Sequence, residues 1–303
     1  MDPVVFVLVA GAAVLHVVWN VLLKTAGDPL RAAAIGMATA ACVICPAALV
    51  GWLAVGRPEI PPLTVALSLV SGLLEAMYFG ILAAAYRRGD LSLVYPLARG
   101  SAPLLAVAIG VVVLGERLGP PGFLGVAFLL VGLLALQRPW RYLRASGRES
   151  GGAAGFALLT GITIASYSAV DRVAVRGTEP WIYAGLIWIS GAVFLWLYRL
   201  AYERRRAAAP ADGSRPRPEP ATPFSVGRAA GGGLITLSAY LLILGAFSVA
   251  PLTAVTPLRE SAIVLASGWG AFRLREAADR GDAVRRIGAA ALVLAGPLLL
   301  AID

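Results

Sequence analysis

The sequence RGSAPLLAVAIGVVVLGE at residues 99–116 recurs 160 residues later as RESAIVLASGWGAFRLRE at residues 259–276. Aligned in this way, the two stretches share an arginine at the first position, a glutamate at the last, and Ser, Ala, Leu and Gly between them. Both stretches are apolar over most of their length, which favours long apolar helices. A match at one fixed spacing indicates that the chain contains an internal repeat.

Apolar runs of similar length fill the rest of the chain. Its 303 residues are 59% hydrophobic and only 14% charged, whereas soluble domains carry about 25% charged residues. A membrane-spanning helix needs about 20 mostly apolar residues. This composition predicts an all-α integral membrane protein and argues against a soluble enzyme, a disordered chain and a secreted disulfide scaffold. Ten runs qualify as spans: 4–23, 30–54, 64–86, 91–114, 120–137, 154–173, 181–200, 228–249, 251–272 and 284–301.

The repeat places the fourth run on the ninth, so each half of the chain contains five spans. Because five is odd, the second half would enter the membrane in the opposite orientation. We therefore predict ten transmembrane helices in two inverted five-helix repeats, at residues 1–137 and 154–303, joined by a basic loop at 138–153. Residues 201–227 are rich in Pro, Ala and Arg and are expected to be disordered.

The basic residues lie mainly in alternate connections. Of the 26 lysine and arginine residues, 20 fall in the odd-numbered connections and 4 in the even-numbered ones. Loops rich in Lys and Arg stay in the cytoplasm, so both termini are predicted to lie outside. This placement also accounts for the net charge of +9 without nucleic-acid binding. The abundance of alanine and arginine favours a bacterial source, and hence the bacterial cytoplasmic membrane.

Several motifs resemble those of a known family. Residues 16–20 read HVVWN and are followed by Lys24, similar to the first-helix pattern of EamA-type members of the drug/metabolite transporter superfamily. Residues 95–116 resemble the fourth helix of that family, and residues 256–276 repeat the pattern without the glycine before the final glutamate. The resemblance implies a ten-helix secondary transporter, usually an exporter of amino acids, metabolites or drugs. Many members keep their termini in the cytoplasm, contrary to the arginine distribution here.

Four charged residues lie well inside predicted spans: Glu75, Arg99, Arg259 and Glu260. A charge at the bilayer centre costs about 2.5 kcal/mol or more, so such residues usually line a polar cavity. Arg99 and Arg259 lie at matching depths in their spans, about 12 Å from opposite membrane faces. Two guanidinium groups meeting at the midplane would bind an anionic group. Alternatively the charges neutralise one another, Glu75 with Arg99 and Glu260 with Arg259, or a carboxyl group carries a proton.

Further candidates for a substrate site lie on the same predicted spans. His16, the single histidine, is either a proton carrier or a neutral packing residue. Aromatic residues within spans either line a cavity or form interfacial belts. Glu116 and Glu276 close two spans, either as gate residues or proton sites or as interfacial charges paired with Arg117 or Arg275. The remaining candidates are Trp19, Asn20, Tyr78, Tyr95, Tyr167, Asp171, Trp188 and Tyr240.

We therefore expect a secondary transporter that exports a small organic metabolite, such as an amino acid, an organic anion or a drug-like compound, by alternating access. Protons are the candidate coupling ion. No P-loop, H-E-x-x-H or G-x-S-x-G motif occurs, so an enzyme is not expected. Cys42 and Cys45 lack a second ligand pair, so neither a metal site nor a cofactor is expected. The alternatives are a flippase for a lipid-linked or amphiphilic substrate, with a laterally open cavity, and an integral membrane enzyme.

Overall fold

A computed structural model describes residues 2–24, 26–88, 91–138, 151–208, 224–260 and 280–301. Within these ranges the chain forms ten α-helices and one 3₁₀ turn, η1 (Val175–Gly177), without any β-strand. The predicted all-helical fold is confirmed, and each of the ten predicted spans overlaps one of these helices. They are α1 (Pro3–Lys24), α2 (Pro29–Ala54), α3 (Pro62–Arg88), α4 (Leu91–Val112), α5 (Pro120–Gln137), α7 (Gly151–Ala174), α8 (Pro180–Ala208), α9 (Val226–Val249), α10 (Leu252–Glu260) and α12 (Arg280–Ala301).

Local sequence explains where several helices begin. The side chain of Asp28 accepts a hydrogen bond from the backbone N–H of Arg31 and so caps α2, and Ser225 caps α9 in the same way through Arg228. Such caps satisfy N–H groups that have no partner inside the helix. Proline is preorganised for a first helical position and has no N–H to satisfy there. It starts five helices, at Pro3, Pro29, Pro62, Pro120 and Pro180.

One helix extends further than the sequence suggested. α8 continues to Ala208, into the segment 201–227 that was expected to be disordered. The composition of its last turns explains the extension, because Arg, Ala and Glu are good helix formers. Arg199 and Glu203, one turn apart, also form an ion pair with a separation of 2.8 Å. Residues 209–223 lie outside the described residues.

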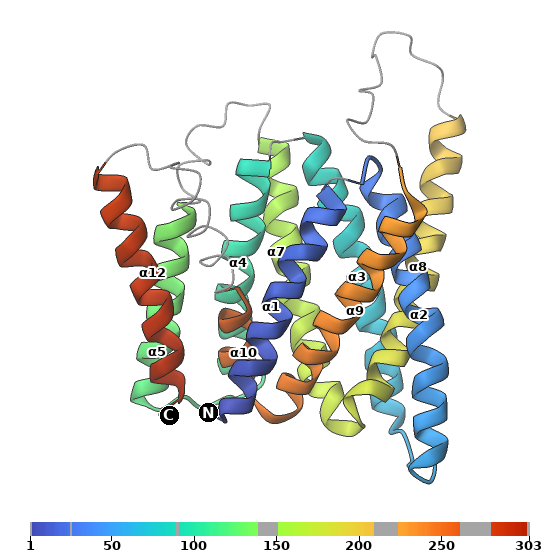
Figure 1. The fold of residues 1–303 in the computed structure, drawn as a ribbon, viewed down its shortest axis with the longest axis horizontal. Helices are drawn as coiled ribbons and strands as arrows, with labels where there is room; N and C mark the ends of the chain where they lie inside the picture. The colour runs from blue at the N-terminus through green and yellow to red at the C-terminus, as the bar shows by residue number, and fades with distance from the viewer. Residues whose placement is uncertain are drawn as a thin grey trace.

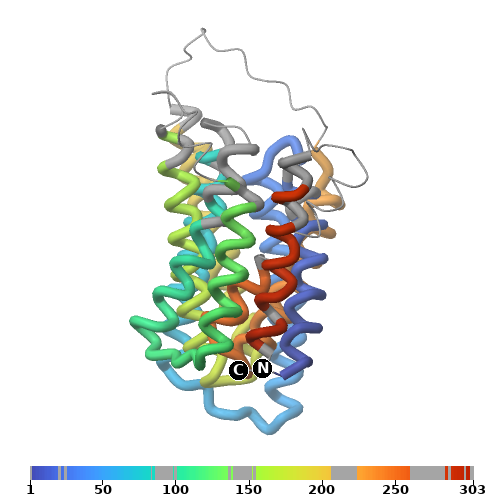
Figure 2. The backbone as a smooth tube through the Cα atoms, turned by 90° about the vertical axis from the view of Figure 1, so that its left-hand side faces the viewer, coloured from blue at the N-terminus to red at the C-terminus, as the bar shows by residue number. Residues whose placement is uncertain are grey.

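The helices run roughly side by side and form a bundle (Figures 1 and 2). α1 begins and α12 ends at the same end of this bundle, where the chain also turns between α2 and α3, α4 and α5, α7 and α8, and α9 and α10 (Figure 1). Helices distant in sequence are neighbours: α1 packs on α9, α3 on α7 and α8, α2 on α8 and α9, α4 on α7 and α10, and α5 on α12. The first half of the chain is therefore covered mainly by the second.

The outside of the bundle is strongly apolar. Large aliphatic side chains such as Val7, Val112 and Leu298 are more than two-thirds exposed. A soluble protein seldom presents so much apolar surface. By length and composition, five helices of the described residues can cross a membrane, which is compatible with a multi-pass membrane protein. These are Pro29–Ala54, Pro62–Leu82, Gly155–Gly177, Pro180–Arg205 and Val226–Val249.

Glycine allows the central helices to approach closely. Gly36 on α2 faces Gly233 on α9, and a Cβ atom added at Gly233 would lie only 2.1 Å from the carbonyl oxygen of Gly36. Gly72 on α3 similarly faces Gly191 on α8, since a Cβ atom at Gly72 would lie 2.7 Å from the backbone nitrogen of Gly191. Small residues at such crossings bring helix backbones into contact. These contacts hold α2 close to α9 and α3 close to α8.

Candidate functional site

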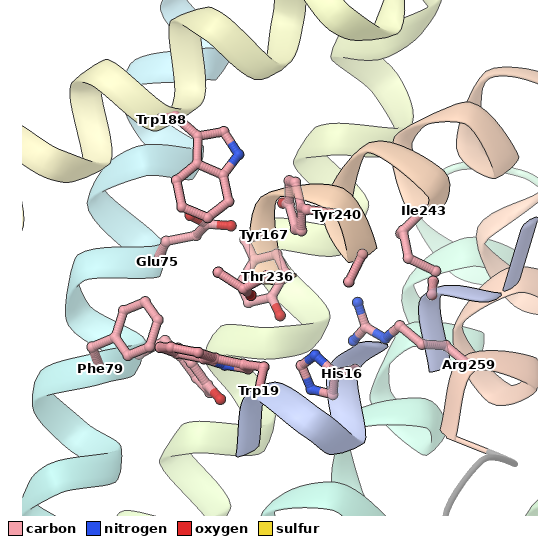
Figure 3. Close-up of a pocket in the computed structure, with 13 residues that line it drawn as sticks. His16, Trp19, Glu75, Phe79, Tyr167, Trp188, Thr236, Tyr240, Ile243 and Arg259 are labelled. Carbon is pink, nitrogen blue, oxygen red and sulfur yellow. The ribbon is translucent and has the colours of Figure 1, made fainter. Parts of the chain in front are cut away.

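A cavity of about 50 Å³ lies among six helices, α1, α3, α7, α8, α9 and α10 (Figure 3). Its walls combine charged, hydroxyl and aromatic side chains. The volume suffices for a few water molecules, whereas a bound metabolite generally needs some hundreds of cubic ångströms. A solute of that size therefore fits only when the surrounding helices move apart.

Asp171 on α7 is the centre of a buried hydrogen-bond cluster next to this cavity. Its side chain has no exposed surface. Its Oδ1 atom accepts hydrogen bonds from the hydroxyl groups of Ser71, at 2.5 Å, and Tyr183, at 2.9 Å. Its Oδ2 atom accepts a third from the hydroxyl of Tyr240. Because the donors belong to α3, α8 and α9, one carboxyl group joins four helices and has the donors that burial of a charge requires.

Glu75 on α3 is the second buried acid. It lies one helical turn after Ser71 and therefore on the same face of α3, and only 6% of its surface is exposed. Its carboxyl group interacts electrostatically with Asp171 and Arg259. Two buried carboxyl groups from different helices, those of Glu75 and Asp171, therefore lie close enough to interact.

Arg259 on α10 brings a positive charge to the same cavity. Its guanidinium group points toward the space between His16 and Tyr240 (Figure 3), and 7% of its surface is exposed. Pro257 lies two residues earlier inside α10. Proline has no N–H, so the helix loses one hydrogen bond immediately before the arginine. In the described lining of the cavity, the carboxyl group of Glu75 is therefore accompanied by the guanidinium group of Arg259 and the imidazole of His16.

Aromatic rings form a continuous series along the cavity wall. Ring centroids lie 6.2 Å apart for Trp19 and Phe79, 4.9 Å for Phe79 and Tyr78, and 6.2 Å for Tyr78 and Tyr167. Tyr240 continues the series, 6.4 Å from Tyr167 and 6.2 Å from Trp188. The Nε1 atom of Trp188 is buried and has no hydrogen-bond partner. The wall thus offers apolar ring surface, which also attracts cations, and an unused hydrogen-bond donor.

Most of the candidates from the sequence come together here. The candidates that line the cavity are His16, Trp19, Glu75, Tyr78, Tyr167, Trp188, Tyr240 and Arg259. Asp171 lies directly behind the wall, bonded to Tyr240. The side chains of Asn20, Tyr95, Arg99 and Glu260 lie outside the described residues. The pairing of Arg99 with Arg259, and the two pairs with the glutamates, therefore stay predictions.

Four residues of the site were not singled out from the sequence. Ser71 could have been found, because it lies four residues before Glu75 and so on the same helix face. Phe79 and Thr236 line the cavity, but apolar and hydroxyl residues are common in every predicted span. Tyr183 bonds to Asp171 across the turn between α7 and α8, a contact that no local pattern indicates.

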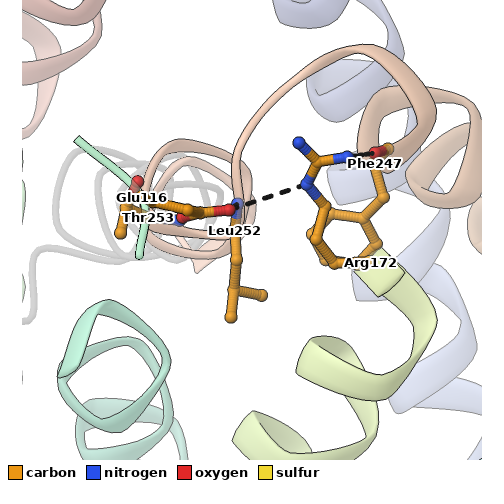
Figure 4. Close-up of polar contacts among 5 residues, drawn as sticks. All are labelled: Glu116, Arg172, Phe247, Leu252 and Thr253. Atoms are coloured by element: carbon orange, nitrogen blue, oxygen red, sulfur yellow. Dashed lines mark hydrogen bonds and ion pairs between the residues drawn. The ribbon is translucent and has the colours of Figure 1, made fainter. Parts of the chain in front are cut away.

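A second polar cluster lies away from the cavity and involves Glu116, which follows α4. The carboxylate of Glu116 accepts hydrogen bonds from the backbone N–H groups of Leu252, at 2.8 Å, and Thr253, at 2.9 Å (Figure 4). Its Oε1 atom lies 3.6 Å from Nε of Arg172 on α7. Arg172 in turn donates to the carbonyl oxygen of Phe247, near the end of α9, at 2.7 Å.

Both charges of this cluster match the helix ends that they contact. An anion is stabilised at a helix N-terminus and a cation near a C-terminus; Glu116 binds the start of α10 and Arg172 the end of α9. The cluster therefore joins α4, α7, α9 and α10 at the end of the bundle where α1 begins. The sequence suggested Arg117 as an ion-pair partner of Glu116, and the structure instead places Arg172 beside it. Glu276 lies outside the described residues.

Comparisons with known proteins address the fold. No family model matches the sequence, and no curated protein matches it. Twenty-eight chains of solved structures match the fold. One of them, described only as "Crystal structure of protein", superposes with a TM-score of 0.67 over 97% of this chain and 98% of that chain, at 18% sequence identity. At this identity the likeness shows a shared fold, so function has to be argued from the site.

Proposed function

We propose that this protein is a secondary transporter of the bacterial cytoplasmic membrane and that it exports a small organic metabolite by alternating access. We also propose that it is related to the EamA-type transporters that its motifs resemble. The main observation behind this proposal is a cavity lined by Glu75, Tyr240 and Arg259, which lies inside a helix bundle with an apolar exterior. Ionisable side chains are costly inside a membrane protein and usually mark the path of a substrate or ion.

Helix packing supports an inverted repeat. In an inverted repeat, α1–α5 would correspond in order to α7, α8, α9, α10 and α12. The contact between α1 and α9 would then correspond to the contact between α7 and α3, and the contact between α2 and α9 to the contact between α8 and α3. All four of these pairs are in contact. The pairs α2 and α8, α4 and α10, and α5 and α12, which lie on the proposed two-fold axis, are also in contact. The cavity lies between helices of both halves, as in inverted-repeat transporters.

The two ends of the bundle differ in basic charge, which supports the proposed orientation. The end where α1 begins carries Arg57, Arg117 and Arg176 near its turns, and the opposite end is richer in arginine (Figure 1). Arginine-rich ends face the cytoplasm, so the termini lie outside in this proposal. Among the described residues, the opposite end carries Arg31, Arg138, Arg199, Arg204, Arg205, Arg228 and Arg285.

The cavity wall favours a substrate with a charged group and an apolar body. Glu75 supplies an acceptor for a cationic group, whereas Arg259 and the unpartnered Nε1 of Trp188 supply donors for an anionic one. The aromatic series provides surface for an apolar part of the molecule. Amino acids and drug-like amines combine these features.

A flippase for an amphiphilic lipid is the second candidate, and a separate cavity favours it. A space of about 260 Å³ lies among α3, α7 and α8 and is lined by Met77, Gly80, Phe156, Phe194 and Tyr198, among others. Its wall is almost entirely apolar, and Met77 is 45% exposed on the outside of the bundle. A lipid chain would fit such a space.

Exchange of radiolabelled solutes across liposomes that contain the purified protein tests both candidates. We expect saturable exchange of an amino acid or amine, and a rate reduced about tenfold or more in Arg259→Ala, since a hydrogen bond to a charged group contributes about 1.5–3 kcal/mol. Arg204→Ala is the control, because Arg204 is exposed at the end of α8. Movement of a fluorescent lipid between leaflets without any solute exchange would favour the flippase instead.

A further inference from the structure

The apolar cavity among α3, α7 and α8 opens on the outside of the bundle. Three residues of its lining are partly exposed there: Leu73 and Met77 at 45% each, and Tyr198 at 39%. The phenol of Tyr198 supplies the only hydroxyl group of the described lining. An empty space leaves the atoms around it without packing partners. In a membrane, the acyl chain of a neighbouring lipid is the group that can fill this space from the side.

α3 separates this apolar cavity from the cavity of the candidate site. The described linings of the two cavities have no residue in common. On α3, Glu75 and Phe79 line the central cavity, whereas Met77 and Gly80 line the apolar one. At about 100° per residue, these two pairs lie on opposite faces of the helix. A chain in the apolar cavity would therefore stay outside the proposed path of the solute, unlike the lipid of a flippase.

One face of α8 leads from the apolar cavity to a basic residue near the helix end. Phe194 and Tyr198 line the cavity, and Tyr202 and Arg205 continue the same face at spacings of four and three residues. The rings of Tyr198 and Tyr202 are stacked, with centroids 6.4 Å apart, and Arg205 is exposed. Apolar, phenolic and cationic groups thus follow one another along α8. A phospholipid has the complementary order of acyl chain, ester groups and phosphate.

Distances along α8 agree with the dimensions of a lipid leaflet. At about 1.5 Å per residue, Arg205 lies about 16 Å beyond Phe194 along the helix axis. Half of the hydrocarbon core of a bilayer measures about 15 Å. With Arg205 at the level of the phosphate groups, the cavity therefore lies at the depth of the acyl chains. Tyr198 and Tyr202 then lie toward the membrane interface, where tyrosine is enriched.

The other described arginine residues near the end of α8 are placed differently. Arg199 forms its ion pair with Glu203 and lies 4.9 Å from the ring centre of Trp196. Arg204 is exposed, but it is turned about 100° around the helix from Arg205. Arg205 is therefore the described basic residue of α8 in line with the cavity. One basic residue near the membrane surface strengthens binding to anionic lipid about fivefold.

We infer that the apolar cavity and this face of α8 form a binding site for an anionic phospholipid, with an acyl chain in the cavity and the phosphate group at Arg205. This inference rests on the membrane location in the proposed function and not on transport. The bound chain packs against the face of α3 opposite Glu75, and so supports the wall of the central cavity from behind.

Native mass spectrometry of the purified full-length protein, titrated with dioleoyl phosphatidylglycerol or dioleoyl phosphatidylcholine, tests the site. We expect the first phosphatidylglycerol to bind about fivefold more tightly than phosphatidylcholine, and Arg205→Ala to abolish this preference. Arg204→Ala is the matched control, because it removes the same charge from an adjacent position outside this face, and it should keep the preference. Equal affinity for both lipids in the wild type, or an equal loss in both variants, would overturn the inference.

Met77→Trp tests the part of the site that holds the acyl chain. The larger side chain should fill the mouth of the cavity and lower the affinity for both lipids several-fold. Val7→Trp, at a position that is 72% exposed on α1, is the control and should bind both lipids normally. Unchanged lipid affinity in a folded Met77→Trp protein would refute the site. Leu73→Trp fills the same mouth if Met77→Trp does not fold.

The lipid titration and the solute-exchange assay can fail separately. Selective binding of phosphatidylglycerol without any solute exchange would reject the transport function and keep the lipid site. Solute exchange by a protein that binds both lipids equally would reject the lipid site alone.

Discussion

Asp171→Ala is expected to unfold at a much lower temperature than the wild-type protein. The substitution removes the common acceptor of Ser71, Tyr183 and Tyr240, and it deletes a buried negative charge near Arg259. Deletion of one member of a buried, hydrogen-bonded charge cluster typically costs about 3–5 kcal/mol. Thermal melting of the purified protein, followed by size-exclusion chromatography, measures the effect.

Two further variants separate the role of Asp171 from that of aspartate in general. Asp171→Asn keeps an acceptor oxygen but loses the charge, so its melting temperature should lie between those of the wild type and Asp171→Ala. Asp28→Ala removes only the cap of α2, which contributes about 1 kcal/mol. Equal melting temperatures for Asp171→Ala and Asp28→Ala would show that the Asp171 cluster does not hold the four helices together.

Glu116→Ala should produce the second largest loss of stability. The substitution leaves the first N–H groups of α10, those of Leu252 and Thr253, without their acceptor, and it removes the ion-pair partner of Arg172. Two hydrogen bonds to a charged acceptor contribute about 1.5–3 kcal/mol each, and exposure of this site to solvent lowers that figure. Melting curves should therefore show a decrease that corresponds to about 2–3 kcal/mol.

Glu179→Ala is the matched control for Glu116. Glu179 is an exposed glutamate in the turn between α7 and α8, at the same end of the bundle. Its loss should leave the melting temperature nearly unchanged, because surface substitutions rarely exceed about 0.5 kcal/mol. If Glu116→Ala melted together with Glu179→Ala, the contacts of Glu116 with α10 would contribute no stability, and a gate built on them would lose its basis.

The positions of the helices could be predicted because their signals are local. Long apolar runs between turns such as Gly27-Asp28-Pro29 and Gly119-Pro120-Pro121 leave few alternatives to helices. The end of α8 was the exception, because charged and alanine-rich turns form a helix as readily as they form a disordered segment.

Single residues that line the cavity could be named from the sequence, whereas the contacts of Asp171 could not. Glu75 and Arg259 stood out because a charge inside an apolar run is costly. Their surroundings depend on tertiary contacts: Ser71 and Asp171 are 100 residues apart. Sequence reasoning offered Arg99 as the partner of Glu75, and the side chain of Arg99 lies outside the described residues. The described charged groups that interact with Glu75 are Asp171 and Arg259.

Cysteine accessibility tests most directly whether the cavity is a water-filled chamber that opens during transport. Thr236 lines the cavity, so Thr236→Cys, in a protein without Cys42 and Cys45, should react in liposomes with a hydrophilic thiol reagent. Ala33→Cys, placed in the packed core where the side chain is 2% exposed, should not react. Equal and negligible reaction at both positions would contradict the account, because a cavity that water never enters cannot carry a solute across a membrane.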